Sequence, residues 1–162
     1  MNKTTKDLTM NALLIALVFI ATRYINISLP YGYFHAGDGF IYAIALTFGY
    51  KRGIVAGALG MGLADALSQY AMYTIPTIII KALMVIVLVT LANKIKGDKI
   101  SIIGMVIAGL VGTLGYFTFE YFYYGVEVAT PMVVPNILQA SVVATLLGSL
   151  LTPIFKRIES NM

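Results

Sequence analysis

Residues 53–72 read GIVAGALGMGLADALSQYAM, twenty positions that include one charged side chain, Asp65. A helix of about 20 apolar residues spans the hydrocarbon core of a bilayer, so this stretch predicts a transmembrane helix. Small residues recur along it at four-residue spacing, at Gly53 and Gly57 and again at Ala56, Gly60 and Ala64. Such rows let helix backbones approach closely in lipid, where apolar contacts alone give little drive to associate. The stretch therefore predicts one member of a compact bundle of membrane helices.

The composition of the whole chain agrees with a membrane protein. Of its 162 residues, 59% are apolar and 11% are charged, against about 25% charged in an average soluble domain. Cysteine is absent and there is one histidine, so disulfides and thiolate sites are excluded and no metal or cofactor is expected. The net charge of +4 indicates membrane orientation and not a nucleic-acid partner.

Charged and turn-forming residues divide the chain into six apolar stretches. We predict an all-α fold, a single integral membrane domain over residues 1–162 with six transmembrane helices in a compact bundle. The predicted spans are residues 8–27, 36–50, 53–72, 75–94, 100–124 and 132–155. The second stretch is short, so an incomplete or re-entrant segment is the alternative there. For the first stretch the alternative is a cleavable signal peptide, because two lysines precede an apolar core of suitable length.

The positively charged residues predict the orientation. With both termini in the cytoplasm, nine of the eleven lysines and arginines lie on the cytoplasmic side, namely Lys3, Lys6, Lys51, Arg52, Lys94, Lys96, Lys99, Lys156 and Arg157. This is the distribution that the positive-inside rule describes. Arg23 and Lys81 are the two cations that this topology leaves elsewhere.

Polar groups are costly in a bilayer, and they mark structural pairs or functional sites. Here they gather toward the outer ends of the predicted helices, and of the eleven tyrosines only Tyr50 lies at a cytoplasmic end. An outward-facing pocket with aromatic walls suits a small planar solute that stacks while its edge is hydrogen-bonded. The candidate substrate-binding residues are His35, Asp38, Tyr42, Asp65, Gln69, Lys81, Glu120, Tyr124, Asn136 and Gln139.

Several of these residues also have a structural interpretation. Asp65 and Lys81 lie at similar depth in neighbouring antiparallel spans, so they either pair with each other or contact a ligand. Glu120 is a candidate partner of Arg23. His35 precedes the second span, where a helix-capping role is the alternative to ligand contact.

The longest outer loop is residues 26–35, NISLPYGYFH. Its proline, its glycine and its three aromatic rings are typical of a loop that gates a site. Pro30, Tyr31, Tyr33 and Phe34 are therefore predicted to form a gating lid, and a passive interfacial loop is the alternative.

Motifs for nucleotide binding and hydrolysis are missing from the sequence. It contains no G-x-x-x-x-G-K-[ST], G-x-S-x-G or H-E-x-x-H pattern, so no catalytic residue and no enzyme activity are expected. An outward pocket without an energy source predicts a binding module that a partner energises. Two alternatives remain: a stand-alone secondary carrier, which would take up solute without an ATPase, and a structural subunit, which would bind no vitamin.

Four groups of residues occur in an order that resembles one family. They are Gly37-Asp-Gly39, Phe48-Gly49 before Lys51-Arg52, Gly57 to Gly62 leading to Ala64-Asp65, and Ile75-Pro-Thr77 followed by Ile80-Lys81-Ala82. Together they are similar to the S components, the substrate-binding membrane subunits of energy-coupling factor (ECF) vitamin transporters. The resemblance is to the subgroup with riboflavin-type, pyridoxine-type and hydroxymethylpyrimidine-type members.

The resemblance implies a six-helix bundle in a prokaryotic plasma membrane that captures a vitamin from outside. It also implies a transmembrane coupling protein and two cytoplasmic ATPases as partners, and an S component that topples in the membrane to release substrate inward. Ala12 and Ala16 match the A-x-x-x-A spacing with which the family contacts the coupling protein. A pyridoxine-like or hydroxymethylpyrimidine-like substrate is expected, with riboflavin as the main alternative.

Overall fold

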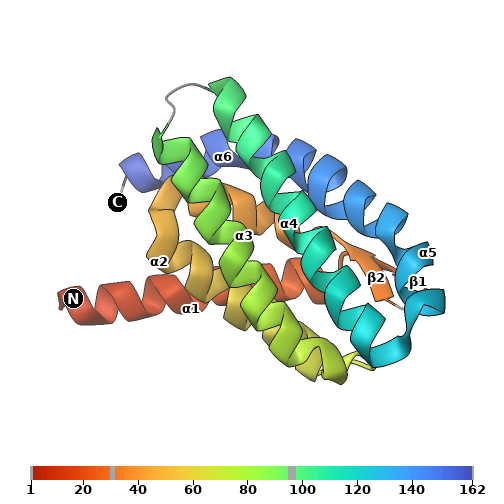
Figure 1. Ribbon diagram of the computed structural model, residues 1–162. Helices are drawn as coiled ribbons and strands as arrows, with labels where there is room; N and C mark the ends of the chain where they lie inside the picture. The colour runs from red at the N-terminus through yellow and green to blue at the C-terminus, as the bar shows by residue number, and fades with distance from the viewer. Residues whose placement is uncertain (1, 30–31, 95–97, 162) are drawn as a thin grey trace.

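The computed structural model describes residues 2–29, 32–94 and 98–161. In chain order these form α1 (Lys3–Arg23), β1 (Asn26–Leu29), β2 (Gly32–His35), α2 (Gly37–Ala66), the 3₁₀ turn η1 (Ala71–Tyr73), α3 (Thr74–Lys94), α4 (Asp98–Tyr124), α5 (Val126–Ile137), the π-helical segment η2 (Leu138–Val143) and α6 (Ala144–Ser160). Figure 1 shows both chain ends at one end of the helical bundle and the two strands at the other. The predicted helical membrane fold is confirmed, but the loop predicted over residues 26–35 is an antiparallel hairpin that pairs Asn26 with His35.

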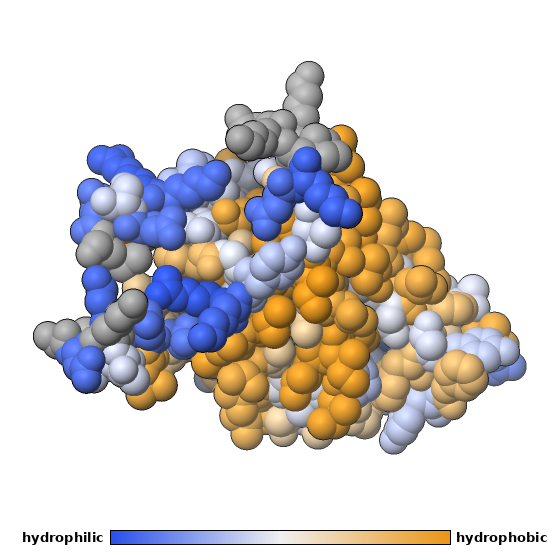
Figure 2. Space-filling view, turned by 60° about the vertical axis from the view of Figure 1, so that its left-hand side comes forward, coloured by the Kyte–Doolittle hydropathy of each residue, from blue (hydrophilic) through white to orange (hydrophobic). Residues whose placement is uncertain are grey.

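The surface of the bundle is suited to lipid. In the described part of the chain, four helical stretches are long and apolar enough to cross a membrane: Thr4–Arg23, Ala71–Lys94, Ser101–Tyr124 and Val126–Ser160. Apolar side chains cover the middle of the face seen in Figure 2, and hydrophilic ones gather at one end. A continuous apolar surface of this extent is stable against hydrocarbon and unfavourable in water.

Helix α2 reverses direction at Gly49. This residue has φ 77° and ψ −168°, a conformation that residues with a Cβ rarely adopt. A Cβ built on Gly53 would lie 3.0 Å from the Cα of Ala45, and one on Gly57 would lie 3.1 Å from the side chain of Ile41. The residues after Gly49 therefore pack back along those before it. The break predicted at residues 51–52 is present, two to three residues earlier.

Three predicted boundaries are wrong. The first stretch was predicted to be helical to residue 27, but α1 ends at Arg23 and β1 begins at Asn26. The third stretch was predicted to be helical to residue 72, but α2 ends at Ala66. A turn follows, in which the Ser68 hydroxyl donates to the carbonyl of Asp65 (2.8 Å) and accepts from the N–H of Tyr70 (3.0 Å). The break predicted over residues 125–131 is confined to Gly125, at φ 90°, because a membrane helix tolerates proline where its neighbours satisfy the freed carbonyl groups.

The core lies around α2, which packs against α1, α3 and α6. Its fully buried side chains include Val18, Ile44, Met84 and Leu88. The predicted role of small residues is confirmed at Gly60, where an added Cβ would lie 2.9 Å from the carbonyl oxygen of Ile15 on α1. The two backbones can approach this closely only because no side chain separates them.

The last long helix widens into a π turn over Leu138–Val143. The nitrogens of Pro131 and Pro135 carry no hydrogen, so two backbone hydrogen bonds are missing just before this segment. Short π segments inside α-helices occur frequently at functional sites. Here the wide turn contains Gln139, which is buried.

Candidate functional site

Five parts of the chain converge on a pocket at the hairpin end of the bundle. Strand β2, the end of α2, η1 with α3, α4, and α5 with η2 each contribute to its wall. Its empty volume is about 540 Å³, including the mouth and the open space above it. This inner pocket is lined by Tyr33, Phe34, His35, Met61, Asp65, Tyr70, Tyr73, Thr77, Tyr116, Glu120, Met132, Pro135, Asn136 and Gln139.

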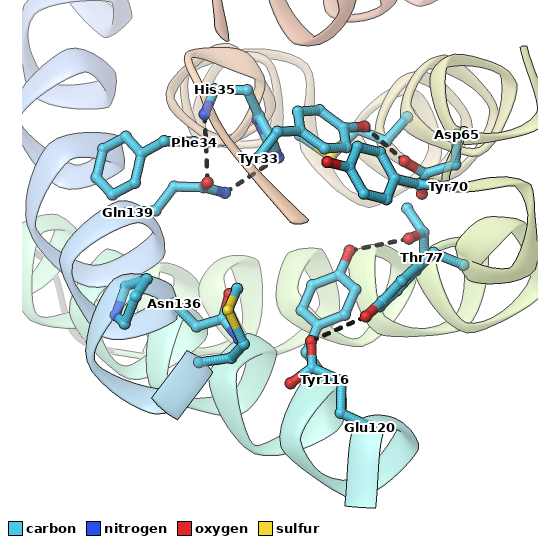
Figure 3. Close-up of a pocket in the computed structure, with 14 residues that line it drawn as sticks. Tyr33, Phe34, His35, Asp65, Tyr70, Thr77, Tyr116, Glu120, Asn136 and Gln139 are labelled. Carbon is cyan, nitrogen blue, oxygen red and sulfur yellow. Dashed lines mark hydrogen bonds between the residues drawn. The ribbon is translucent and has the colours of Figure 1, made fainter. Parts of the chain in front are cut away.

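Aromatic rings form much of the wall, and Figure 3 shows several of them facing one another across it. Tyr33 stacks on Tyr70 with ring centroids 5.1 Å apart and an interplanar angle of 22°. Tyr73 meets Tyr70 edge-on at 6.4 Å and lies 6.2 Å from Tyr116. Rings arranged in this way offer both faces and edges to a planar aromatic solute.

Tyr33 fastens the hairpin to the end of α2. Its hydroxyl donates to the Asp65 carboxylate (2.5 Å). Burial and the neighbouring Asp65 raise the pKa of Tyr33, so its hydroxyl keeps its proton at neutral pH. The Thr77 hydroxyl lies 3.0 Å from the hydroxyl of Tyr116, which links α3 to α4 in the same wall.

Gln139 fastens the hairpin from the opposite side. Its Oε1 accepts from the backbone N–H of His35 (3.2 Å), and its Nε2 donates to Oδ2 of Asp38 (3.0 Å). The same Nε2 lies 3.0 Å from Nε2 of His35, so His35 accepts there and carries its hydrogen on Nδ1. Burial lowers the pKa of His35, and the ring is therefore neutral at pH 7.

A buried ion pair lies behind this wall. The Lys81 ammonium is 2.7 Å from Oδ1 of Asp38, and the two side chains are 1% and 0% exposed. Lys81 also lies 5.0 Å from the centre of the Tyr116 ring, where the ring face attracts a cation. Neither charged residue lines the inner pocket. Asp38 nevertheless accepts a hydrogen bond from the lining residue Gln139, and Lys81 forms the ion pair with Asp38.

Three polar atoms on residues that line the pocket have no hydrogen-bond partner among the described residues. They are Nδ1 of His35, Oε2 of Glu120 and Nδ2 of Asn136. Buried polar groups are normally paired, because an unpaired one costs about 1–3 kcal/mol. Each belongs to a residue that lines the pocket, so these two donors and one acceptor are polar groups that the described part of the protein leaves unpaired there.

The family sequence profile described as "ECF-type riboflavin transporter, S component" matches residues 2–157, nearly the whole chain. The chain belongs to the S components of ECF transporters. An uncharacterised protein of Pyrococcus woesei, described as lying in the gap 3′ region, is 30% identical over 125 residues. These cover 76% of this S component and 84% of that relative. As a family member, this S component is a substrate-binding transporter subunit and works with an ECF module of membrane and ATPase subunits.

Half of the predicted substrate-binding residues of this S component line the inner pocket: His35, Asp65, Glu120, Asn136 and Gln139. Tyr42 lies elsewhere, fully buried, with its hydroxyl donating to the carbonyl of Ala140 (2.9 Å). Gln69 lies in a neighbouring hollow. Tyr124 is 37% exposed and packs 6.3 Å from Tyr73. The pocket lining therefore leaves out Tyr42, Gln69 and Tyr124 as well as the Asp38–Lys81 pair.

Both ion pairs predicted from the sequence are wrong. Lys81 pairs with Asp38 and not with Asp65, whose carboxylate accepts from the Tyr33 hydroxyl instead. Glu120 does not pair with Arg23, since its Oε1 accepts from the Tyr73 hydroxyl (3.3 Å). Arg23 lies in the hollow that contains Gln69.

In the predicted gating loop, Tyr33 and Phe34 line the pocket, and Pro30 and Tyr31 lie outside the described residues. Seven further residues line the pocket and were not among the predicted ones: Met61, Tyr70, Tyr73, Thr77, Tyr116, Met132 and Pro135. A signal for one of them was present, because Tyr116 precedes the predicted residue Glu120 by four positions. Residues four apart share one helix face, so an acidic residue and the tyrosine one turn before it point to the same wall.

Proposed function

We propose that this S component captures a small planar heteroaromatic vitamin from outside the cell, in first place a pyridoxine-like or hydroxymethylpyrimidine-like compound. The observation that carries this proposal is the combination of tyrosine rings with unpartnered polar atoms in one pocket. Nδ1 of His35 and Nδ2 of Asn136 donate, and Oε2 of Glu120 accepts. A substituted pyridine or pyrimidine offers ring nitrogens or hydroxyls to the donors and an amino or hydroxyl hydrogen to the acceptor.

Riboflavin is the second candidate, and two observations favour it. The first is that the matching family is described by that vitamin. The pyrimidine edge of a flavin also presents two carbonyl acceptors on either side of one N–H donor, which complements the same three wall atoms.

The topology proposed for this function has six helical segments that cross the membrane. They are α1, the two halves of α2 on either side of Gly49, α3, α4 and the long helix from Val126 to Ser160, within one domain over residues 1–162. Both chain ends lie at the end of the bundle opposite the hairpin (Figure 1). With that end in the cytoplasm of a prokaryotic cell, the pocket faces outward and the rule for positive residues is satisfied.

A thermal-shift panel tests the function first. The purified chain in detergent is heated with pyridoxine, pyridoxal, hydroxymethylpyrimidine, thiamine or riboflavin. We expect one compound to stabilise the protein by about 2.7 kcal/mol when present at 100 times its Kd. Glu120→Gln combined with Asn136→Leu should lose that shift, and Glu159→Gln, an exposed change at the other end, should keep it. If none of the five compounds shifts the unfolding temperature, the proposed substrate class is wrong.

Tyr33→Phe is expected to weaken binding of that compound about five- to tenfold, through faster release. The change removes the hydroxyl that holds the hairpin to Asp65 and keeps the ring that stacks on Tyr70, and one hydrogen bond is worth about 1 kcal/mol. Tyr24→Phe is the matched control, because Tyr24 is 73% exposed. Dissociation rates are measured by dilution of the loaded protein. Equal dissociation rates for Tyr33→Phe and the wild type would show that the hairpin does not gate the pocket.

A further inference from the structure

A second hollow adjoins the inner pocket on its outer side. This outer vestibule has an empty volume of about 560 Å³ and is lined by Arg23, Asn26, Tyr33, Ser68, Gln69 and Tyr70. Its wall comes from the last turn of α1, from the hairpin, and from the turn that follows α2. Tyr33 and Tyr70 line both spaces, so their stacked rings separate the vestibule from the inner pocket.

Most hydrogen-bonding groups of the vestibule are occupied by the protein itself. The Ser68 hydroxyl serves the turn after α2, and the Tyr33 hydroxyl serves Asp65. The amide nitrogen of Asn26 donates to the backbone carbonyls of Thr22 and Arg23. These bonds fix the shape of the wall and leave few of its polar atoms for a ligand.

The guanidinium of Arg23, unlike these groups, has no ion-pair partner among the described residues. Among the described residues, both ion pairs involve other cations, Arg52 with Asp7 and Lys81 with Asp38. Arginine presents up to five donors in a planar fork that matches the oxygens of a phosphate or carboxylate. The exposed Gln69 amide stands in the same wall. The vestibule therefore has a permanent positive charge, with donors and without a carboxylate partner.

We infer that the outer vestibule is a second subsite, which holds the phosphate ester of a vitamin whose ring occupies the inner pocket. The inference rests on the proposed function for the position of the ring. The shared residues Tyr33 and Tyr70 are the point at which ring and substituent meet. With this subsite the S component accepts the phosphorylated form of its vitamin as well as the free form, and Arg23 is the specificity-determining residue.

The test compares dissociation constants for a vitamin and its phosphate ester. The pairs are pyridoxal with pyridoxal 5′-phosphate, hydroxymethylpyrimidine with its phosphate, and riboflavin with riboflavin 5′-phosphate, measured by titration calorimetry on the purified chain. In the wild type, the ester is expected to bind at least as tightly as its parent. In Arg23→Gln, the ester should weaken about tenfold while the parent is unchanged. Arg157→Gln makes the same charge change at an exposed position on α6 and should leave both constants unaltered.

Two results would overturn the inference without touching the proposed function. One is a parent vitamin that binds while its ester binds more than tenfold more weakly in both the wild type and Arg23→Gln. The other is binding of a lipid phosphate, and not a vitamin phosphate, at Arg23. It is tested by measuring the stability of the protein in nanodiscs of phosphatidylcholine with and without phosphatidylglycerol. If Arg23→Gln removes only a stabilisation by phosphatidylglycerol, Arg23 binds headgroups and not substrate. If no parent vitamin binds, the proposed function fails, and stabilisation by inorganic phosphate that Arg23→Gln abolishes would still support an anion subsite.

Discussion

Lys81→Met is expected to lower the free energy of unfolding by about 3–5 kcal/mol, because it leaves the carboxylate of Asp38 buried without its cation. The pair is closed at 2.7 Å, and both side chains are excluded from solvent. The loss should also reach the inner pocket, since Asp38 is one of the groups that hold Gln139 and Gln139 holds the hairpin at His35. The measurement is thermal and denaturant unfolding of the purified protein in detergent, together with vitamin binding.

Asp38→Asn combined with Lys81→Met separates the pair from its individual members. This double variant removes both charges and keeps an oxygen that can accept from Gln139, so it should recover at least half of the stability that Lys81→Met loses. Asp65→Asn combined with Lys81→Met is the matched control, and its effects should add, because Asp65 bonds Tyr33 instead. A Lys81→Met variant within about 1 kcal/mol of the wild type would show that the buried pair contributes little.

Ala12→Trp or Ala16→Trp is expected to abolish vitamin uptake and to leave vitamin binding in detergent near the wild-type level. Both alanines are exposed on α1, while Leu14 and Val18 on the opposite side are buried. We propose that this exposed row docks on the transmembrane coupling protein of the module. A tryptophan there would hold the two helix backbones apart without entering the fold.

Leu114→Trp provides the control for that experiment. Leu114 is 65% exposed on α4, so it places the same ring on a different lipid-facing surface. Uptake is measured in cells that express the whole module, and binding is measured on the isolated chain. Normal uptake by both tryptophan variants would show that this row of α1 does not dock on the coupling protein. Loss of vitamin binding would indicate a folding defect.

Much of this fold can be predicted from the sequence, because lipid imposes simple requirements. A stretch such as residues 75–94 has to be a helix, since no other local structure pairs its backbone within a bilayer. The gathering of polar residues at one end of the predicted helices indicated where a pocket lies, and His35, Asp65, Glu120, Asn136 and Gln139 line it. These inferences depend on depth in the membrane, and depth follows directly from position along a helix.

Partners across helices are not predictable in the same way. Depth alone does not distinguish Asp38 from Asp65 as the partner of Lys81, because both lie near the outer side of the bundle. The choice depends on the direction in which each side chain leaves its helix: Gly62 in the second half of α2 packs on Ile78 of α3, yet the Lys81 ammonium reaches Asp38 in the first half. The hairpin was missed for a related reason, since four-residue strands carry too little alternation to be recognised in a segment with proline and glycine.

The wide turn over Leu138–Val143 changes which residues of the last helix share a face. An α-helix rotates about 100° per residue, so nine positions of regular helix would place Gln139 and Gly148 about 180° apart. Both face the interior, Gln139 at the pocket and Gly148 against Met105 and Tyr42. A π turn takes up one residue more than an α turn, which brings the angle between them to about 80°. The π turn therefore rotates the following residues about the helix axis. As a result, one continuous helix lines the pocket near its start and packs against the core farther along.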